Sequence, residues 1–212
     1  ESFTAKDVIY LITPDRFANG DLSNDQMPGL IEGPNRAAKG GRHGGDIQGI
    51  IDHLDYIHDM GFTQIWTNPM IENDQGDHSY HGYSATDFYQ IDARFGSNEL
   101  YRQLSQQASQ QGIGLIKDVV LNHIGSNHWW MKDLPMADWL NYQNTFGKKD
   151  AFVGTHHKRE SLHDPHASMQ DKKLFSDGWF VPTMPDLNQR NPFVSTYLIQ
   201  NTLWWIEYTN LS

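Results

Sequence analysis

Short apolar runs and stripes of helical spacing alternate along the chain. Each apolar run has the length of a strand, and the last is almost continuously apolar, as expected of a strand covered on both faces. The three predicted strands are 8–12, 63–67 and 113–120. Asn68-Pro69 ends the second run, because proline cannot donate a hydrogen bond within a sheet.

Between these runs, apolar residues recur at the spacing of a helical face, which predicts amphipathic helices. In the first helix, Asp46 can cap the start and Gly61 ends the pattern. In the third, Pro192 occupies the first helical position, where its missing N–H removes no helical hydrogen bond. The three predicted helices are 46–60, 97–111 and 191–208.

The order strand, helix, strand, helix, strand, helix is the pattern of parallel βα units, so the sequence predicts an α/β fold. Short turns follow the first two helices, whereas long segments follow the strands. These long segments are 13–45, 68–96 and 121–190. Because sites in such folds lie at the carboxyl ends of the strands, we expect the functional residues in these segments.

Composition narrows the range of partners. The chain has 212 residues and a net charge of −10 at pH 7, a sign that repels nucleic acid and anionic membrane surfaces. It has no apolar run as long as a membrane span. We therefore expect neither nucleic acid nor membrane as a partner, whereas a neutral substrate or a bound cation remains compatible.

Small oxygen-bearing residues are concentrated after the first predicted strand. A hard cation such as Ca²⁺ prefers several oxygen ligands supplied by a sharply turning backbone. The Gly44 carbonyl and the Asp46 carboxylate could complete such a site from a second loop. The candidate ligands are Asn19, Asp21, Asn24, Asp25, Gly44 and Asp46. An ordinary turn rich in Asn and Asp remains the alternative, because these residue types also dominate turns.

Three further strings bear polar or aromatic side chains at places where a site is expected. The third strand ends in DVVLNH at 118–123, and its polar groups need partners at the mouth of a sheet. HGYSATDFY at 81–89 and MPDLN at 184–188 lie in the second and third long segments. Each of the two is weak evidence alone.

Taken together and in this order, the strings resemble the α-amylase superfamily, the retaining glycoside hydrolases of family 13. The segments 10–25 and 44–46 are similar to the calcium loop of its cyclomaltodextrinase and neopullulanase branch. The resemblance covers essentially all 212 residues. It implies the first three βα units of a (β/α)8 TIM barrel, with a long domain-B-like insertion after the third strand.

The resemblance also implies roles for individual residues. Tyr83 matches the tyrosine that stacks under the sugar at the cleavage subsite, and His123 matches the histidine that hydrogen-bonds the same sugar. Asp118 matches an aspartate that organises the site without attacking. The six candidate ligands match calcium ligands of the branch, so Ca²⁺ is the implied cofactor. The implied substrates are cyclomaltodextrins or maltodextrins with α-1,4 bonds, and a homo-oligomer is compatible with the resemblance.

No residue of this chain matches the catalytic carboxylates of the family. A retaining glycosidase needs two carboxyl groups about 5 Å apart, and the family carries them on its fourth and fifth strands. We therefore assign no catalytic residue here, expect the nucleophile and the acid/base beyond Ser212, and expect this chain to be an inactive piece of a larger enzyme. Its expected parts are the first part of the barrel at 1–122, a protruding domain-B-like region at 123–190, and the third barrel helix at 191–212.

Two other functions remain open. An α-1,6-specific or transglycosylating relative would share these residues, because the discriminating positions follow the nucleophile. A non-catalytic glucan- or calcium-binding module is the second, motivated by an aromatic content of 12% and by half of a sugar subsite. The absence of cysteine excludes disulfides without deciding the compartment. No compartment is assigned, although a periplasmic or secreted location is favoured over a cytoplasmic one.

Overall fold

A three-stranded parallel sheet lies at the centre of the computed structural model, which describes residues 4–148, 151–156 and 163–211. Its order is β1-β2-β3, with β1 at Ile9–Ile12, β2 at Gln64–Thr67 and β3 at Gly114–Lys117. Ile12 lies opposite Thr67, and Thr67 lies opposite Lys117, so all three strands end at the same edge. The predicted strand positions and the parallel α/β arrangement are confirmed.

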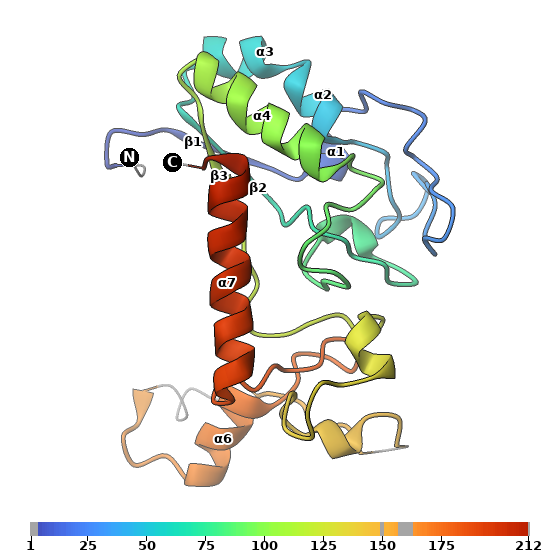
Figure 1. Ribbon diagram of the computed structural model, residues 1–212, viewed down its shortest axis with the longest axis vertical. Helices are drawn as coiled ribbons and strands as arrows, with labels where there is room; N and C mark the ends of the chain where they lie inside the picture. The colour runs from blue at the N-terminus through green and yellow to red at the C-terminus, as the bar shows by residue number, and fades with distance from the viewer. Residues whose placement is uncertain (1–3, 149–150, 157–162, 212) are drawn as a thin grey trace.

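Two long helices begin and end close to where the sequence places them. Helix α4 spans Asn98–Gln110, and its N-cap Ser97 accepts a hydrogen bond from the Leu100 amide. Helix α7 spans Pro192–Thr209 and is capped by the side chain of Asn191. Figure 1 shows α7 running from the level of α6 (Met169–Asp177) up to the strands, with α2, α3 and α4 gathered above. A one-turn helix, α1 (Pro14–Phe17), follows β1.

The predicted single helix over 46–60 is wrong, because two helices replace it. Helix α2 spans Ile47–Ile51 and α3 spans Leu54–Asp59. In an unbroken helix the amide of His53 would bond to the carbonyl of Gly49. Instead that amide bonds to Ile50, and the ring Nδ1 of His53 lies 2.7 Å from the Gly49 oxygen. The side chain thus takes the place of one backbone hydrogen bond and interrupts the helix.

The third strand is shorter than predicted. Its pairing with β2, its one neighbour in the described sheet, ends at Lys117, so Asp118 and the residues after it lie outside the strand. Alternation across the pleat then separates the two adjacent side chains. Lys117 Nζ lies 4.3 Å from the ring centroid of Trp205 in α7, whereas the Asp118 carboxylate faces Trp66 of β2 and Tyr83 of the loop that follows β2.

The core lies between the sheet and the helices that cover it. Ile65 of β2, Leu104 of α4 and Trp205 of α7 are each exposed by 1% or less. Across the part of the chain that the structure describes, no helix is long and apolar enough to cross a bilayer.

Segment 121–190 contains little regular secondary structure, and its later part pairs with the residues that follow β3. His123 pairs with Asp186, and Leu140 with Leu187, in isolated antiparallel bridges. Of the adjacent pair Trp129 and Trp130, Trp130 is buried, and its ring packs on those of Trp139 and Tyr197. Only Trp129 of that pair is exposed.

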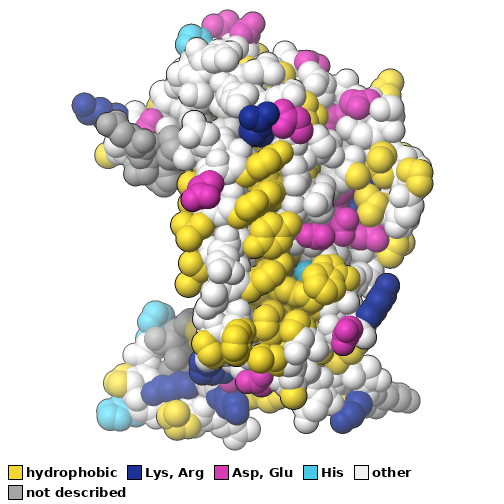
Figure 2. Space-filling model, viewed as in Figure 1, with side chains coloured by type: hydrophobic (Ala, Val, Ile, Leu, Met, Phe, Trp, Pro, Cys, Tyr) yellow, Lys and Arg dark blue, Asp and Glu magenta, His cyan; other side chains and the backbone are white. Residues whose placement is uncertain are grey.

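One flank of the molecule carries apolar side chains in contact with solvent. Figure 2 shows a band of them along the length of α7. Its exposed members on that helix are Phe193, Ile199, Leu203 and Ile206. An apolar groove of about 350 Å³ lies along the same helix and reaches Leu121.

Candidate functional site

Three side chains from separate parts of the chain meet at the carboxyl edge of the sheet. The Tyr83 hydroxyl donates to Asp118 Oδ2 at 3.1 Å, and Trp66 Nε1 donates to the same oxygen at 3.1 Å. Burial and the neighbouring Asp118 carboxylate raise the pKa of Tyr83, so its phenol stays protonated and donates. Two of the predicted substrate-binding residues are therefore in direct contact.

The backbone before Tyr83 is sharply bent. A short 3-10 helix, η1 (Ser79–His81), ends at Gly82, which has φ +82°. A Cβ at this position would collide with the Pro69 carbonyl, so only glycine fits. His81 Nδ1 then accepts a 2.8 Å hydrogen bond from the Tyr83 amide, which fixes the backbone of Tyr83 relative to the turn.

His123, the third predicted substrate-binding residue, reaches Tyr83 through the backbone. Its Nε2 lies 2.9 Å from the Tyr83 carbonyl, and its Nδ1 lies 3.2 Å from Asn122 Nδ2. These partners assign the neutral tautomer with the proton on Nε2. Burial lowers the pKa of His123, which agrees with a neutral ring. The ring also stacks on Phe180, with ring centroids 5.8 Å apart. Through its bond to the Tyr83 carbonyl, His123 supports the loop that carries this tyrosine.

The string at 184–188 packs directly on this strand end. Ile124 donates its amide to the Pro185 carbonyl, and Leu187 donates its amide to the Asn122 carbonyl. The carboxylate of Asp186 accepts a 2.7 Å hydrogen bond from Asn141 Nδ2. Burial raises the pKa of Asp186 to about 7. The structure therefore brings together the two strings that the sequence singles out separately.

Five of the six candidate calcium ligands also cluster. Asn19 Nδ2 donates to Asp25 Oδ1 at 2.7 Å, and Asn24 Nδ2 donates to Asp46 Oδ2 at 3.2 Å. Gly44, at φ +90°, packs so closely on Asp25 that a Cβ would collide with its carboxylate. The Oδ1 atoms of Asn19 and Asn24 are buried without a hydrogen-bond partner among the described residues. Two unsatisfied amide oxygens are a donor set that fits a hard cation.

The sixth candidate, Asp21, points elsewhere. Its Oδ1 accepts from the amide and the hydroxyl of Ser23, and the residue is exposed. Asp46 is largely occupied, since its carboxylate accepts the amides of Gly20, Asp21 and Gly49. Within residues 4–148, 151–156 and 163–211, no group of three His, Cys, Asp or Glu side chains is arranged to hold a metal. A cation here would therefore depend on amide and carbonyl oxygens.

Polar side chains gathered at the carboxyl ends of parallel strands are the arrangement of α/β catalytic domains. The family model of the alpha-amylase catalytic domain matches residues 11–211. The chain belongs to this alpha-amylase family.

Named relatives agree with that assignment. A beta/alpha-amylase from Paenibacillus polymyxa is 33% identical over 211 residues, covering 98% of this chain and 16% of the relative. A cyclomaltodextrinase from Thermoanaerobacter pseudethanolicus is 33% identical over 210 residues, covering 99% of this chain and 33% of the relative. The crystal structure of an Anoxybacillus alpha-amylase is similar at a TM-score of 0.77 and 36% identity, covering 97% of this chain and 39% of that one. The chain thus spans no more than two fifths of these proteins.

Sequence reasoning missed Trp66 and Phe180 as members of the site. Trp66 lies in a predicted strand, and its place one residue before the strand end was a usable signal. Phe180 stacks on His123 from far along the chain, and no local pattern indicates that contact.

Proposed function

We propose that the protein containing this chain is a retaining glycoside hydrolase that cleaves α-1,4 bonds of cyclomaltodextrins or maltodextrins. The observation that carries the proposal is the contact between Tyr83 and Asp118, with His123 behind the tyrosine. In a member of the alpha-amylase family, a half-buried aromatic ring beside a fixed carboxylate suits a pyranose ring. Its face would stack on the sugar, and the polar groups would orient the hydroxyls.

Exposed apolar side chains on the sheet and on α7 support a larger barrel. Leu11 and Trp66 on the sheet are exposed by 57% and 38%, and Ile199 on α7 by 60%. Such surfaces call for a covering layer. We propose that residues 1–122 and 191–212 form three βα units of a (β/α)8 barrel, and that 123–190 protrude as an insertion. The nucleophile and the acid/base would then come from the remaining units.

Calcium is the proposed resident cation. Asn19 and Asn24 would offer their unpaired amide oxygens, Asp25 its carboxylate and Gly44 its carbonyl. When bound, the ion would hold the segment after β1 in place and supply no chemistry to the sugar. Residues of the 19–25 loop are hydrogen-bonded to Asp46 at the start of α2, so the role of the calcium ion would be structural.

An α-1,6-specific or transglycosylating enzyme is compatible with the same residues and is separated by its products. The test is to incubate the full protein with a cyclodextrin, maltotriose and pullulan, and to identify the sugars released. Maltose and glucose from cyclodextrin support the proposal, whereas cleavage of pullulan at its α-1,6 bonds alone, with no cleavage of cyclodextrin, supports the α-1,6 alternative. The 212-residue chain alone should release nothing, and sugar binding without hydrolysis by the full protein would favour the non-catalytic module.

A further inference from the structure

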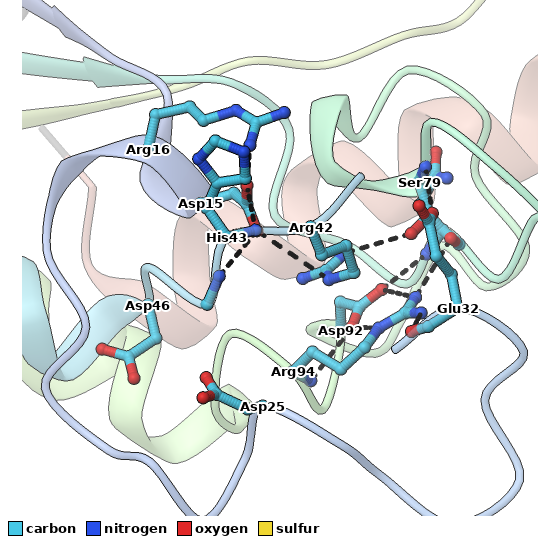
Figure 3. A network of polar contacts seen from close by, with 12 residues as sticks. Asp15, Arg16, Asp25, Glu32, Arg42, His43, Asp46, Ser79, Asp92 and Arg94 are labelled. Atoms are coloured by element: carbon cyan, nitrogen blue, oxygen red, sulfur yellow. Dashed lines mark hydrogen bonds and ion pairs between the residues drawn. The ribbon is translucent and has the colours of Figure 1, made fainter. Parts of the chain in front are cut away.

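A buried chain of charged and polar side chains joins the candidate calcium loop to the segment that carries Tyr83. Figure 3 shows this network, with Asp15 and Arg42 between the loop at Asp25 and Asp46 and the segment at Ser79. Asp15, Arg42 and Ser79 are each exposed by 1% or less. Neither Asp15 nor Arg42 belongs to the proposed ligand set or touches Tyr83.

At the calcium end, the Asp15 side chain holds the second loop through hydrogen bonds to backbone amides of that loop. The carboxylate accepts the His43 amide at 2.9 Å and the Gly44 amide at 3.2 Å. Gly44 is the residue that packs on Asp25. Asp15 and Asp25 therefore both contact Gly44, and a shift of the second loop away from Asp25 would strain its hydrogen bonds to Asp15.

Arg42 carries the connection onward. Its Nε lies 4.0 Å from Asp15 Oδ1, and its Nη1 donates to Ser79 Oγ at 3.2 Å. The guanidinium also lies 4.6 Å from the Phe95 ring centroid, which restricts its position. A buried guanidinium that loses a partner is left with an uncompensated charge, which destabilises the fold strongly. The two partners of this guanidinium, Asp15 and Ser79, are therefore coupled, because a shift of either one disturbs the contact with the other.

At the sugar end, Ser79 begins the 3-10 turn that leads to Tyr83. The Ser79 amide donates to Glu32 Oε2 at 2.8 Å, and Arg94 holds the Glu32 carbonyl at 2.8 Å. His81, at the other end of the turn, accepts the Tyr83 amide. The Ser79 hydroxyl is thus the point at which Arg42 contacts the turn.

We propose that Arg42 is a positioning residue that couples cation binding at 19–25 and 44–46 to the order of the turn 79–83. This inference rests on the proposed function, because it assumes a calcium ion in the first loop and a sugar at Tyr83. Calcium would fix Gly44, Asp15 and then Arg42, and the Ser79 hydrogen bond would pass that order to the tyrosine. The protein would then present Tyr83 correctly only with its cation bound.

Hydrogen exchange of the full protein, with calcium and with a chelator, tests the coupling without relying on activity. In the unmodified protein, calcium should slow exchange of the amides of 19–25, 44–49 and 79–83. We expect about a fivefold or larger effect at 79–83, the lower end of usual coupling energies. In Ser79→Ala, the calcium effect should persist at 19–25 and fall below about twofold at 79–83. Arg42→Met should behave in the same way.

Arg36→Ala is the matched control. Arg36 also contacts the second loop, through a 2.8 Å hydrogen bond to the His43 carbonyl, but no contact to Ser79 is present among the described residues. It should leave the calcium effect at 79–83 unchanged. Undiminished slowing in Ser79→Ala would overturn the coupling, and this variant decides the matter if Arg42→Met does not fold. Slowing at 19–25 without slowing at 79–83 in the unmodified protein rejects the coupling alone, whereas no calcium effect anywhere rejects the cation site as well.

Discussion

The hydroxyl of Tyr83 donates a 3.1 Å hydrogen bond to the carboxylate of Asp118, across 35 positions of sequence. Tyr83 lies in the segment after β2, and Asp118 is the first residue after β3. The contact is possible because parallel strands end at one edge, so the residues that follow neighbouring strands come together. It joins the two parts of the chain that the proposed sugar site requires.

Replacing Tyr83 separates the contribution of its ring from that of its hydroxyl. Tyr83→Phe keeps the ring and loses the hydrogen bond, so we expect a loss of about 1 kcal/mol in stability and less than about threefold in maltose affinity. Tyr83→Ala also loses the stacking face and should weaken binding by about tenfold or more. Calorimetry on the full protein measures both. Tyr56→Phe, at an exposed tyrosine of α3, is the control. An unchanged maltose affinity in Tyr83→Ala would remove Tyr83 from the site.

Gly82 should not tolerate a side chain. Its φ of +82° and the adjacent Pro69 carbonyl make Gly82→Ala strained, so we expect a loss of about 2 kcal/mol in the free energy of unfolding. Gly76→Ala, in the same segment, is the matched control because a Cβ there meets open space. Urea unfolding compares the two variants, and equal stabilities would contradict the steric argument.

Calcium should stabilise the protein through the two unpaired amide oxygens. We expect calcium to raise the thermal midpoint of the unmodified protein, and Asn24→Ala to abolish most of that rise. Ser23→Ala is the control, because Ser23 is exposed and bonds only to Asp21 among the described residues. Differential scanning calorimetry with and without a chelator measures the shift. An unaltered calcium response in Asn24→Ala and in Asn19→Ala would exclude this ligand set.

Asp186 should make stability depend on pH. Burial raises its pKa from 3.8 to about 7, so the folded protein holds this proton more tightly than the unfolded chain. That contribution is complete below the unfolded pKa and is lost as the pH rises through about 7. Asp186→Asn keeps an acceptor for Asn141 without a charge. It should therefore be more stable than the unmodified protein at pH 8 by about 4 kcal/mol, and less different at pH 4.

Denaturant unfolding at the two pH values measures this difference. Asp133→Asn, an exposed aspartate of the same segment, should show no such trend. A constant difference between Asp186→Asn and the unmodified protein across this range would show that folding does not raise the pKa of Asp186.

Local pattern predicts the strands and the long helices well, for identifiable reasons. Helix α7 has a proline at its first position and an Asn cap, and α4 has a Ser cap, so their starts are written into neighbouring residues. The break between α2 and α3 is not, because it depends on how the His53 ring turns. Helix α6 was missed, although Ser168 three residues before Asp171 is a capping signal.

The candidate site divides in the same way. Tyr83, Asp118 and His123 could be chosen from short strings and a resemblance, but their contacts could not. That His123 supports the Tyr83 carbonyl, and that Trp66 shares the Asp118 oxygen, follow from packing between separate segments. Asp15, in the one-turn helix α1, and Arg42, in a loop, escaped notice because a lone charged residue gives no sign that it will be buried.

Asp46 has a consequence for protein engineering. One carboxylate caps the start of α2 and also anchors the amides of Gly20 and Asp21. A designer who transplants the 19–25 loop onto another scaffold must therefore carry the first turn of that helix with it. Shortening the loop in place would also alter the start of the helix, so the loop and the first turn of α2 have to be redesigned together.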